Sequence, residues 1–221
     1  MKQQGWPQNV VDVIAAEVRR HRTRLKMSAQ RLSDRCEELG YPVARNTISN
    51  LENGRKETLT VTELAVIAAA LRVPLLLLMY PVGQVGRVEA LPGVEMEPLH
   101  GLLWASGLFE QYAGEDWPRP PSGVPDVDEE SVQVITLYRA HESAVRGWQD
   151  VRRIARPGAP ALVTSAGVVA SFRSAIAAHG RPLPELPADL AAELASPASL
   201  AAARSAAAAL TDGIRQTFGG E

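Results

Sequence analysis

The sequence predicts a mainly α-helical protein, with five short helices in the first 80 residues, a short β-arm and then a helical C-terminal region. Apolar residues recur every three to four positions through most of the chain, which is the spacing of one face of a helix. Residues that begin or end helices flank these stretches: Ser28 suits an N-cap, and Gly40 and Gly54 each follow a periodic run. An alternating apolar and polar stretch around Leu91-Pro92-Gly93, residues 85–97, predicts the arm.

The first helix is expected over residues 8–26. Its inner face is expected to carry Val10, Val11, Ile14, Val18 and Leu25, and its outer face Arg19, Arg20, Arg24 and Lys26. The second helix follows Ser28 and should bury Leu32, Cys36 and Leu39. The remaining three are expected over residues 44–53, from a cap at Thr60 or Thr62 to Leu71, and over Leu75–Met79 after Pro74.

The C-terminal region is expected to hold four more helices and one exposed loop. The helices should cover residues 100–112, 132–154, 167–179 and an alanine-rich stretch from Ser196 to about Phe218, and the loop should cover residues 114–128. The expected inner stripe of the helix over 132–154 is Ile135, Tyr138, Val145, Trp148 and Val151, widened by Leu137, Ala144 and Ile154. The sequence therefore divides into residues 1–80, a linker or arm over 81–98, and a domain over 99–221.

The composition favours a folded protein that is neither secreted nor inserted in a membrane. Apolar residues make up 46% of the 221 and charged residues 22%, as in a folded domain. Cys36 is the single cysteine, so an intramolecular disulfide is excluded and a reducing cytoplasm fits. The longest apolar run, residues 73–80, is too short to span a bilayer, so neither secretion nor membrane insertion is expected. Residues 1–80 hold twelve Lys and Arg against eight Asp and Glu, a basic balance that suits a DNA-facing domain.

The stretch from Arg45 to Glu57 carries the clearest functional signal. It predicts a short helix with polar residues on one side and the apolar anchors Ile48 and Leu51 on the other, followed by Gly54 and two cations. A helix that enters the major groove of DNA needs this division into a polar face and an anchored face.

Residues 14–79 resemble the lambda-repressor-like, or XRE-family, helix-turn-helix domain. The core of the resemblance runs from Ser28 to Gly54 and includes Leu-Glu-Asn-Gly at 51–54. The order of cap, helix, break, helix, glycine stop and amphipathic helix is that of the family. The link over residues 38–44 is longer than the family's usual tight turn, which affects the angle between the second and third helices.

Residue roles follow from side-chain chemistry together with this resemblance. Arginine can bind guanine through O6 and N7, and asparagine can bind adenine through N6 and N7. The candidates for base readout are Arg45, Asn46, Thr47, Ser49 and Asn50. The candidates for phosphate contacts, near helix starts or after the third helix, are Ser28, Gln30, Asn53, Arg55 and Lys56. The resemblance further implies that Glu52 turns inward and forms a structural ion pair with Arg22 of the first helix.

The C-terminal region shows no comparable motif. His141-Glu142 lacks a second histidine at the spacing of a helical zinc site, and no nucleophile motif or phosphate-binding glycine loop occurs, so no metal, no cofactor and no enzymatic activity are expected. His141 is expected on the helix surface or at an interface. The helix over residues 132–154 and the alanine-rich helix could each pair two copies of the chain or form internal core.

These observations predict a sequence-specific DNA-binding transcriptional regulator, a repressor that binds an inverted-repeat operator as a homodimer. An alternative is a protein-interaction module such as the antitoxin of a toxin pair, in which the helix-turn-helix domain serves autoregulation. Residues 99–221 would then bind a protein partner, or alternatively a small-molecule effector.

Overall fold

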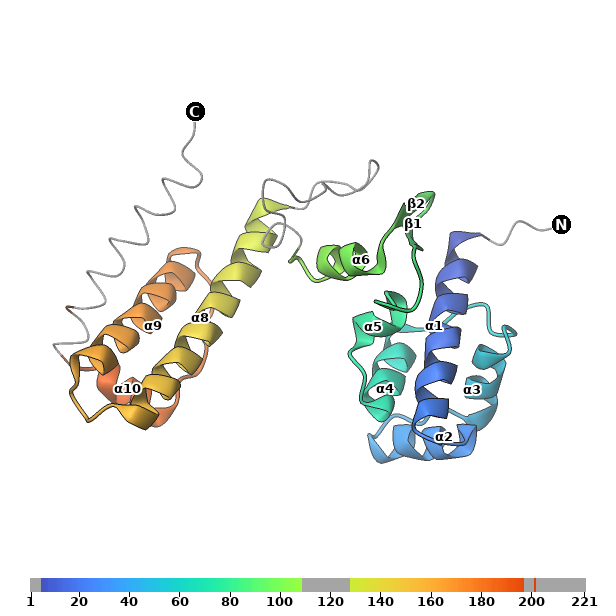
Figure 1. Cartoon of the computed structure of the whole chain (residues 1–221), viewed down its shortest axis with the longest axis horizontal. Helices are drawn as coiled ribbons and strands as arrows, with labels where there is room; N and C mark the ends of the chain where they lie inside the picture. Colours follow the sequence, from blue (N-terminus) through green and yellow to red (C-terminus); the bar gives the residue numbers. More distant parts are fainter. Residues whose placement is uncertain (1–4, 109–127, 197–200, 202–221) are drawn as a thin grey trace. The chain divides into compact units, whose positions relative to one another are not determined.

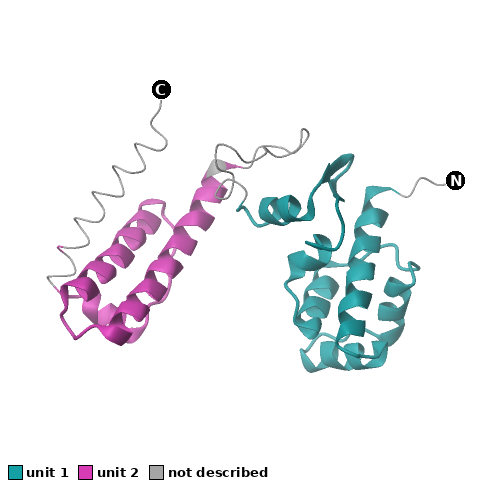
Figure 2. Cartoon of the chain, in the orientation of Figure 1, with its two compact units in different colours: residues 1–126 teal, residues 127–221 magenta. Residues whose placement is uncertain are grey.

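The computed structural model describes residues 5–108, 128–196 and 201 (Figure 1). The chain forms two compact units, residues 1–126 and residues 127–221 (Figure 2). The described part consists of helices and one two-stranded hairpin, which confirms the mainly helical fold. Because α6 lies in the first unit, that unit extends beyond the sequence-based boundaries at residues 80 and 98.

The first unit begins with five helices. They are α1 (Trp6–Arg24), α2 (Ala29–Glu38), α3 (Arg45–Glu52), α4 (Val61–Leu71) and α5 (Leu75–Met79). Local chemistry defines several ends. The Ser28 hydroxyl accepts a hydrogen bond from the backbone N–H of Arg31, and Thr60 and Glu63 form a reciprocal capping box at the start of α4. After α3 the chain turns through Gly54, whose φ of 67° favours glycine.

One hydrophobic core joins these five helices. Its fully or almost fully buried members include Val18, Leu32, Cys36, Ile48, Leu51, Ile67, Leu71 and Leu78. The expectation that Leu25 and Leu39 are inner residues is wrong: their side chains are 38% and 54% exposed. Both residues are helix C-caps, where the backbone leaves the helical path that the periodicity assumes.

The predicted arm is an antiparallel hairpin of β1 (Val88–Leu91) and β2 (Val94–Met96). Its turn includes Gly93, at a φ of 74°. The hairpin is tied to the start of α1, because the indole N–H of Trp6 donates to the carbonyl of Glu89 and the Asn9 amide donates to the Glu89 carboxylate. The hairpin is therefore an integral part of the first unit.

Helix α6 (Pro98–Ala105) follows the hairpin and packs against α5 and β1. It begins two residues before the predicted helix over 100–112 and ends at Ala105; residues 109–112 of that prediction lie outside the described residues, as does the predicted loop up to residue 127. Gly101 is buried against the ring of Tyr80. This contact leaves no room for a larger residue.

The second unit contains α8 (Glu129–Ile154), α9 (Pro160–Ala178) and α10 (Ala188–Leu194). Helix α9 begins seven residues before the predicted Gly167, because Pro160 stands in its first turn. The sequence did not predict α10. The predicted alanine-rich helix falls on residues that, apart from Ser196 and Ala201, lie outside the described part.

The core of the second unit forms between α8 and α9, with Leu190 of α10. Its buried members are Val145, Trp148, Leu162, Ala166, Val169 and Leu190. Among the described helices, α9 alone is long and apolar enough, by length and composition, to cross a membrane. Leu162, Ala166 and Val169 of α9 belong to the core of the unit, and 33% of the apolar stretch is buried.

Two details of α8 differ from the sequence-based expectation. Ile135 and Ile154 are 40% and 88% exposed, so the predicted inner stripe is narrower than expected. His141, expected at the surface, is fully buried. Its position is three residues after Tyr138 and four before Val145, which places it on the inner stripe of the helix.

Candidate nucleic-acid interface

Helix α3 separates its residues by polarity. Ile48 and Leu51 are completely buried, and they anchor the helix to the core of the first unit. Arg45, Asn46 and Asn50 are exposed on the opposite side, whereas Thr47 and Ser49 are half-buried. The Arg45 guanidinium makes no ion pair with any described residue. The first turn and outer face of α3 therefore present hydrogen-bonding groups to solvent.

A two-pronged ion pair fixes the position of α3. The Nε and Nη2 atoms of Arg22 each donate to one carboxylate oxygen of Glu52, both at 2.6 Å. The Nη1 atom of Arg22 also donates to the carbonyl oxygen of Met27 at 2.6 Å. These hydrogen bonds with Glu52 raise the pKa of Arg22, against the opposing effect of burial. One guanidinium thus connects α1, the end of α3 and the segment that leads into α2.

The long link between α2 and α3 is held by side chains. The hydroxyl of Ser33 donates to the carbonyl of Val43 at 2.7 Å, and the Val43 side chain is only 3% exposed. Gly40 provides the turn after α2, with a φ of 86°. The Tyr41 hydroxyl lies 3.3 Å from the hydroxyl of Thr62 on α4. These contacts give the link a defined path between the two helices despite its length.

Comparison with known proteins agrees with this geometry. Residues 18–78 match a family model described as helix-turn-helix. Residues 18–78 are an XRE-type helix-turn-helix domain. No curated protein and no solved structure gives a significant match to the chain. A domain of this type indicates DNA binding and transcriptional regulation, and the family comparison identifies no catalytic family.

The predicted phosphate-contact residues lie in two places, after α3 and at the start of α2. Asn53 and Arg55 are exposed directly after α3, where the backbone turns away from the helix. Ser28 is exposed at the start of α2 but uses its oxygen to cap the helix. Gln30 is exposed, and its amide donates to Asp34 one turn later. Arg55 is thus the cation best placed for a phosphate.

Lys56, unlike Arg55, forms an ion pair within the domain. Its ammonium group lies 3.1 Å from a carboxylate oxygen of Glu63, and its side chain is 22% exposed. Burial raises the pKa of Glu63, but the hydrogen bonds from Thr60 and Lys56 outweigh it and leave that pKa below its ordinary value. The Lys56 charge therefore already has a carboxylate partner at the start of α4, which reduces its capacity to neutralise a phosphate.

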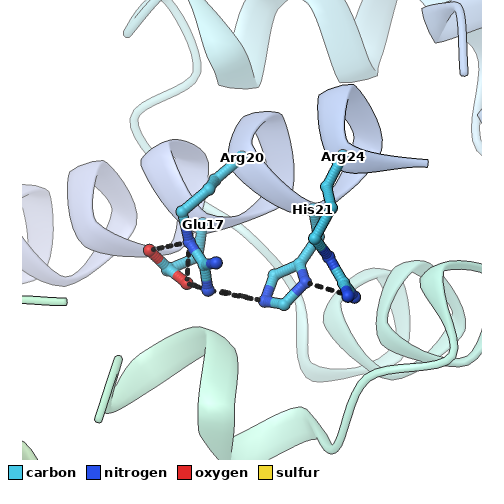
Figure 3. Close-up of polar contacts among 4 residues, drawn as sticks. All are labelled: Glu17, Arg20, His21 and Arg24. Atoms are coloured by element: carbon cyan, nitrogen blue, oxygen red, sulfur yellow. Dashed lines mark hydrogen bonds and ion pairs between the residues drawn. The ribbon is translucent and has the colours of Figure 1, made fainter. Parts of the chain in front are cut away.

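The sequence did not reveal a buried polar cluster on α1 of the domain, shown in Figure 3. Glu17 and His21 are 5% and 4% exposed. Arg20, expected on the outer face, instead donates to Glu17 and lies 2.9 Å from a ring nitrogen of His21. Burial, followed by the charge of Arg20, lowers the pKa of His21. In the sequence, only the helical spacing of Glu17, Arg20 and His21 indicates that these side chains interact. That spacing does not distinguish a buried cluster from an ion pair on the surface.

An open groove of about 680 Å³ lies between α1 and the end of α3. Its lining includes Arg19, Arg20, Asp12 and Glu52. Glu17 neutralises Arg20 and Arg22 neutralises Glu52, so the groove is left with one cation and one anion and does not favour a charged ligand. The described residues contain no group of three or more His, Cys, Asp or Glu side chains able to hold a metal ion.

Proposed function

We propose that the protein is a cytoplasmic, sequence-specific transcriptional regulator, a repressor, that places α3 in the major groove of its operator. One observation carries the proposal: α3 is anchored by Ile48 and Leu51 while it exposes Arg45, Asn46 and Asn50. The exposed groups match the hydrogen-bonding patterns of guanine and adenine at the major-groove edge. Thr47 and Ser49, which are half-buried, are placed at the margins of the same face and contact bases or the adjacent backbone.

Base readout predicts different losses on specific and random DNA. Arg45→Ala or Asn46→Ala is expected to weaken binding to the selected site by about 1 to 3 kcal/mol per lost contact, and binding to random DNA much less. Fluorescence anisotropy at one fixed salt concentration measures both affinities. Arg87→Ala, which removes an exposed arginine just before β1, is the control and should leave both unchanged. Equal losses on the two DNAs for Arg45→Ala would mean that this side chain does not read bases.

If Arg55 and Lys56 contact phosphates, their removal should change how DNA affinity depends on salt concentration. Arg55→Ala is expected to weaken binding to all sequences and to lower the slope of log affinity against log salt by about one, because each neutralised phosphate releases counterion. Lys56→Ala should lower that slope less than Arg55→Ala, since Lys56 is paired with Glu63. Arg87→Ala removes an exposed charge just before β1 and serves as the control. A slope unaffected by Arg55→Ala would remove Arg55 from the interface.

Homodimerisation is the second part of the proposal. Helix α3 has eight residues and can contact only a few base pairs, so two copies on a two-fold axis would lengthen the operator to an inverted repeat. The predicted apolar face of α8 is largely occupied within its own unit, by Val145 and Trp148. Residues 99–221 outside that core therefore supply the interface. Sedimentation should find a dimer of the full chain; a monomer well above the DNA dissociation constant would instead support a protein partner or an effector for this region.

A further inference from the structure

The second unit contains an ionisable side chain with no polar partner. His141 is fully buried on α8, and neither of its ring nitrogens has a hydrogen-bond partner among the described residues. A neutral imidazole carries one donor and one acceptor, and leaving buried polar atoms unpaired costs about 1 to 3 kcal/mol. The indole nitrogen of Trp148, seven residues further along α8, is also buried without a partner. The α8–α9 packing is therefore apolar around a group that can acquire a charge.

The charged groups near His141 do not favour a cation. The positive charge of Arg173 on α9 repels a protonated His141 ring. The Nη1 atom of Arg173 donates to the carbonyl of Pro184, a contact that does not neutralise this charge. Glu142, the neighbour of His141 on α8, is exposed and opposes this effect less than Arg173 promotes it. Two further charges near α9 and α10 are paired elsewhere, Arg181 with Glu130 and Asp189 with Arg152. Burial first, and Arg173 second, lower the pKa of His141.

We propose that His141 makes the second unit acid-sensitive, so that mild acidification favours the opening of the contact between α8 and α9. A protonated imidazole has two donors, and no group among the described residues accepts a hydrogen bond from either ring nitrogen. When the contact between α8 and α9 opens, water can accept a hydrogen bond from both ring donors.

The direction of the pH effect follows from linkage. The folded unit binds fewer protons than the unfolded unit, because the pKa of His141 is lower when the ring is buried. The stabilisation is thus complete above the ordinary histidine pKa of about 6.5 and is lost as the pH falls below it. At pH 5.5, one unit below that value, the opening equilibrium of the second unit should rise by at most about tenfold.

Hydrogen exchange of the full chain, read by mass spectrometry at pH 7.5 and 5.5 and corrected for intrinsic exchange rates, tests this proposal unit by unit. Peptides from α8 and α9 are expected to lose protection at pH 5.5, by at most about tenfold. Peptides from α4 report the helix-turn-helix domain separately, where burial also lowers the pKa of His21, and any loss there should not change in the His141 variants.

Two variants test whether His141 causes the loss of protection at low pH. His141→Leu removes the titrating group and keeps an apolar side chain, so protection of α8 and α9 should become the same at both pH values. His141→Gln, which is polar but does not titrate, should show the same independence of pH. It replaces the leucine variant in the test if that variant does not fold. His179→Gln changes an exposed histidine at the end of α9 and should leave the loss of protection at pH 5.5 in place. Unchanged protection of α8 and α9 in the original chain, or a loss that persists in either His141 variant, would overturn the proposal.

Discussion

Replacing Glu52 by alanine is expected to lower the free energy of unfolding of the helix-turn-helix domain by about 3 kcal/mol. The Arg22 and Glu52 side chains are only 17% and 8% exposed, so removal of the carboxylate leaves a mostly buried guanidinium with the Met27 carbonyl as its remaining protein partner. Because the same contact orients α3, DNA affinity should fall with stability. Chemical denaturation, followed by circular dichroism, measures the first effect.

The chain offers a matched control for this ion pair. Arg31 and Glu38 also form an ion pair, at 2.9 Å, but their side chains are 50% and 60% exposed. Glu38→Ala is therefore expected to cost less than 1 kcal/mol, because water screens an exposed pair. If Glu52→Ala destabilises the protein no more than Glu38→Ala, the Arg22–Glu52 contact does not fix α3 in the way described here.

Gly101→Ala is expected to destabilise the first unit by about 2 kcal/mol through overpacking. A methyl group at this position would lie 2.6 Å from Cε1 of Tyr80 and nearer still to Cδ1, so α6 or the Tyr80 ring must move. Tyr80 is 5% exposed, which leaves its ring little space. Thermal unfolding of the full chain measures the change.

Gly147→Ala on α8 provides the comparison for Gly101→Ala. Apart from the backbone of α8 and the two chain neighbours, no atom of the described residues lies within 4 Å of the added methyl group, and alanine favours a helix over glycine by about 1 kcal/mol. This variant should therefore be neutral or slightly stabilised. Equal stability of the two variants would show that α6 does not pack tightly on Tyr80.

The sequence predicted those parts of the fold that local chemistry specifies. Ser28 caps α2, Gly54 turns the chain after α3 and Thr60, one of two predicted candidates, caps α4, since each of these signals acts within one helical turn. Periodicity failed at helix ends, where Leu25 and Leu39 continue the apolar pattern after the backbone has left the helix. It also failed at α10, whose seven residues are too few to show a period.

Polar residues in buried positions were harder to predict. His141 stands on the apolar stripe of α8, but histidine at such a position usually avoids complete burial, so its side-chain chemistry pointed to the surface. In the candidate site, residue types and helical spacing were sufficient to predict the exposed polar face of α3. The pairing of Lys56 with Glu63 and of Arg20 with Glu17 depends on how the helices pack, which periodicity does not encode.

The central claim is that α3 reads a base sequence, and selection of bound DNA from a random pool tests it most directly. The full chain and an Arg45→Ala, Asn46→Ala double variant would be carried through identical rounds at one salt concentration. The account predicts that the full chain enriches a defined motif, present as two inverted copies about one helical turn apart, and that the double variant loses preference at the bases these side chains contact. Recovery of no enriched motif by the full chain, or of the same motif with the same preference by the double variant, would contradict it.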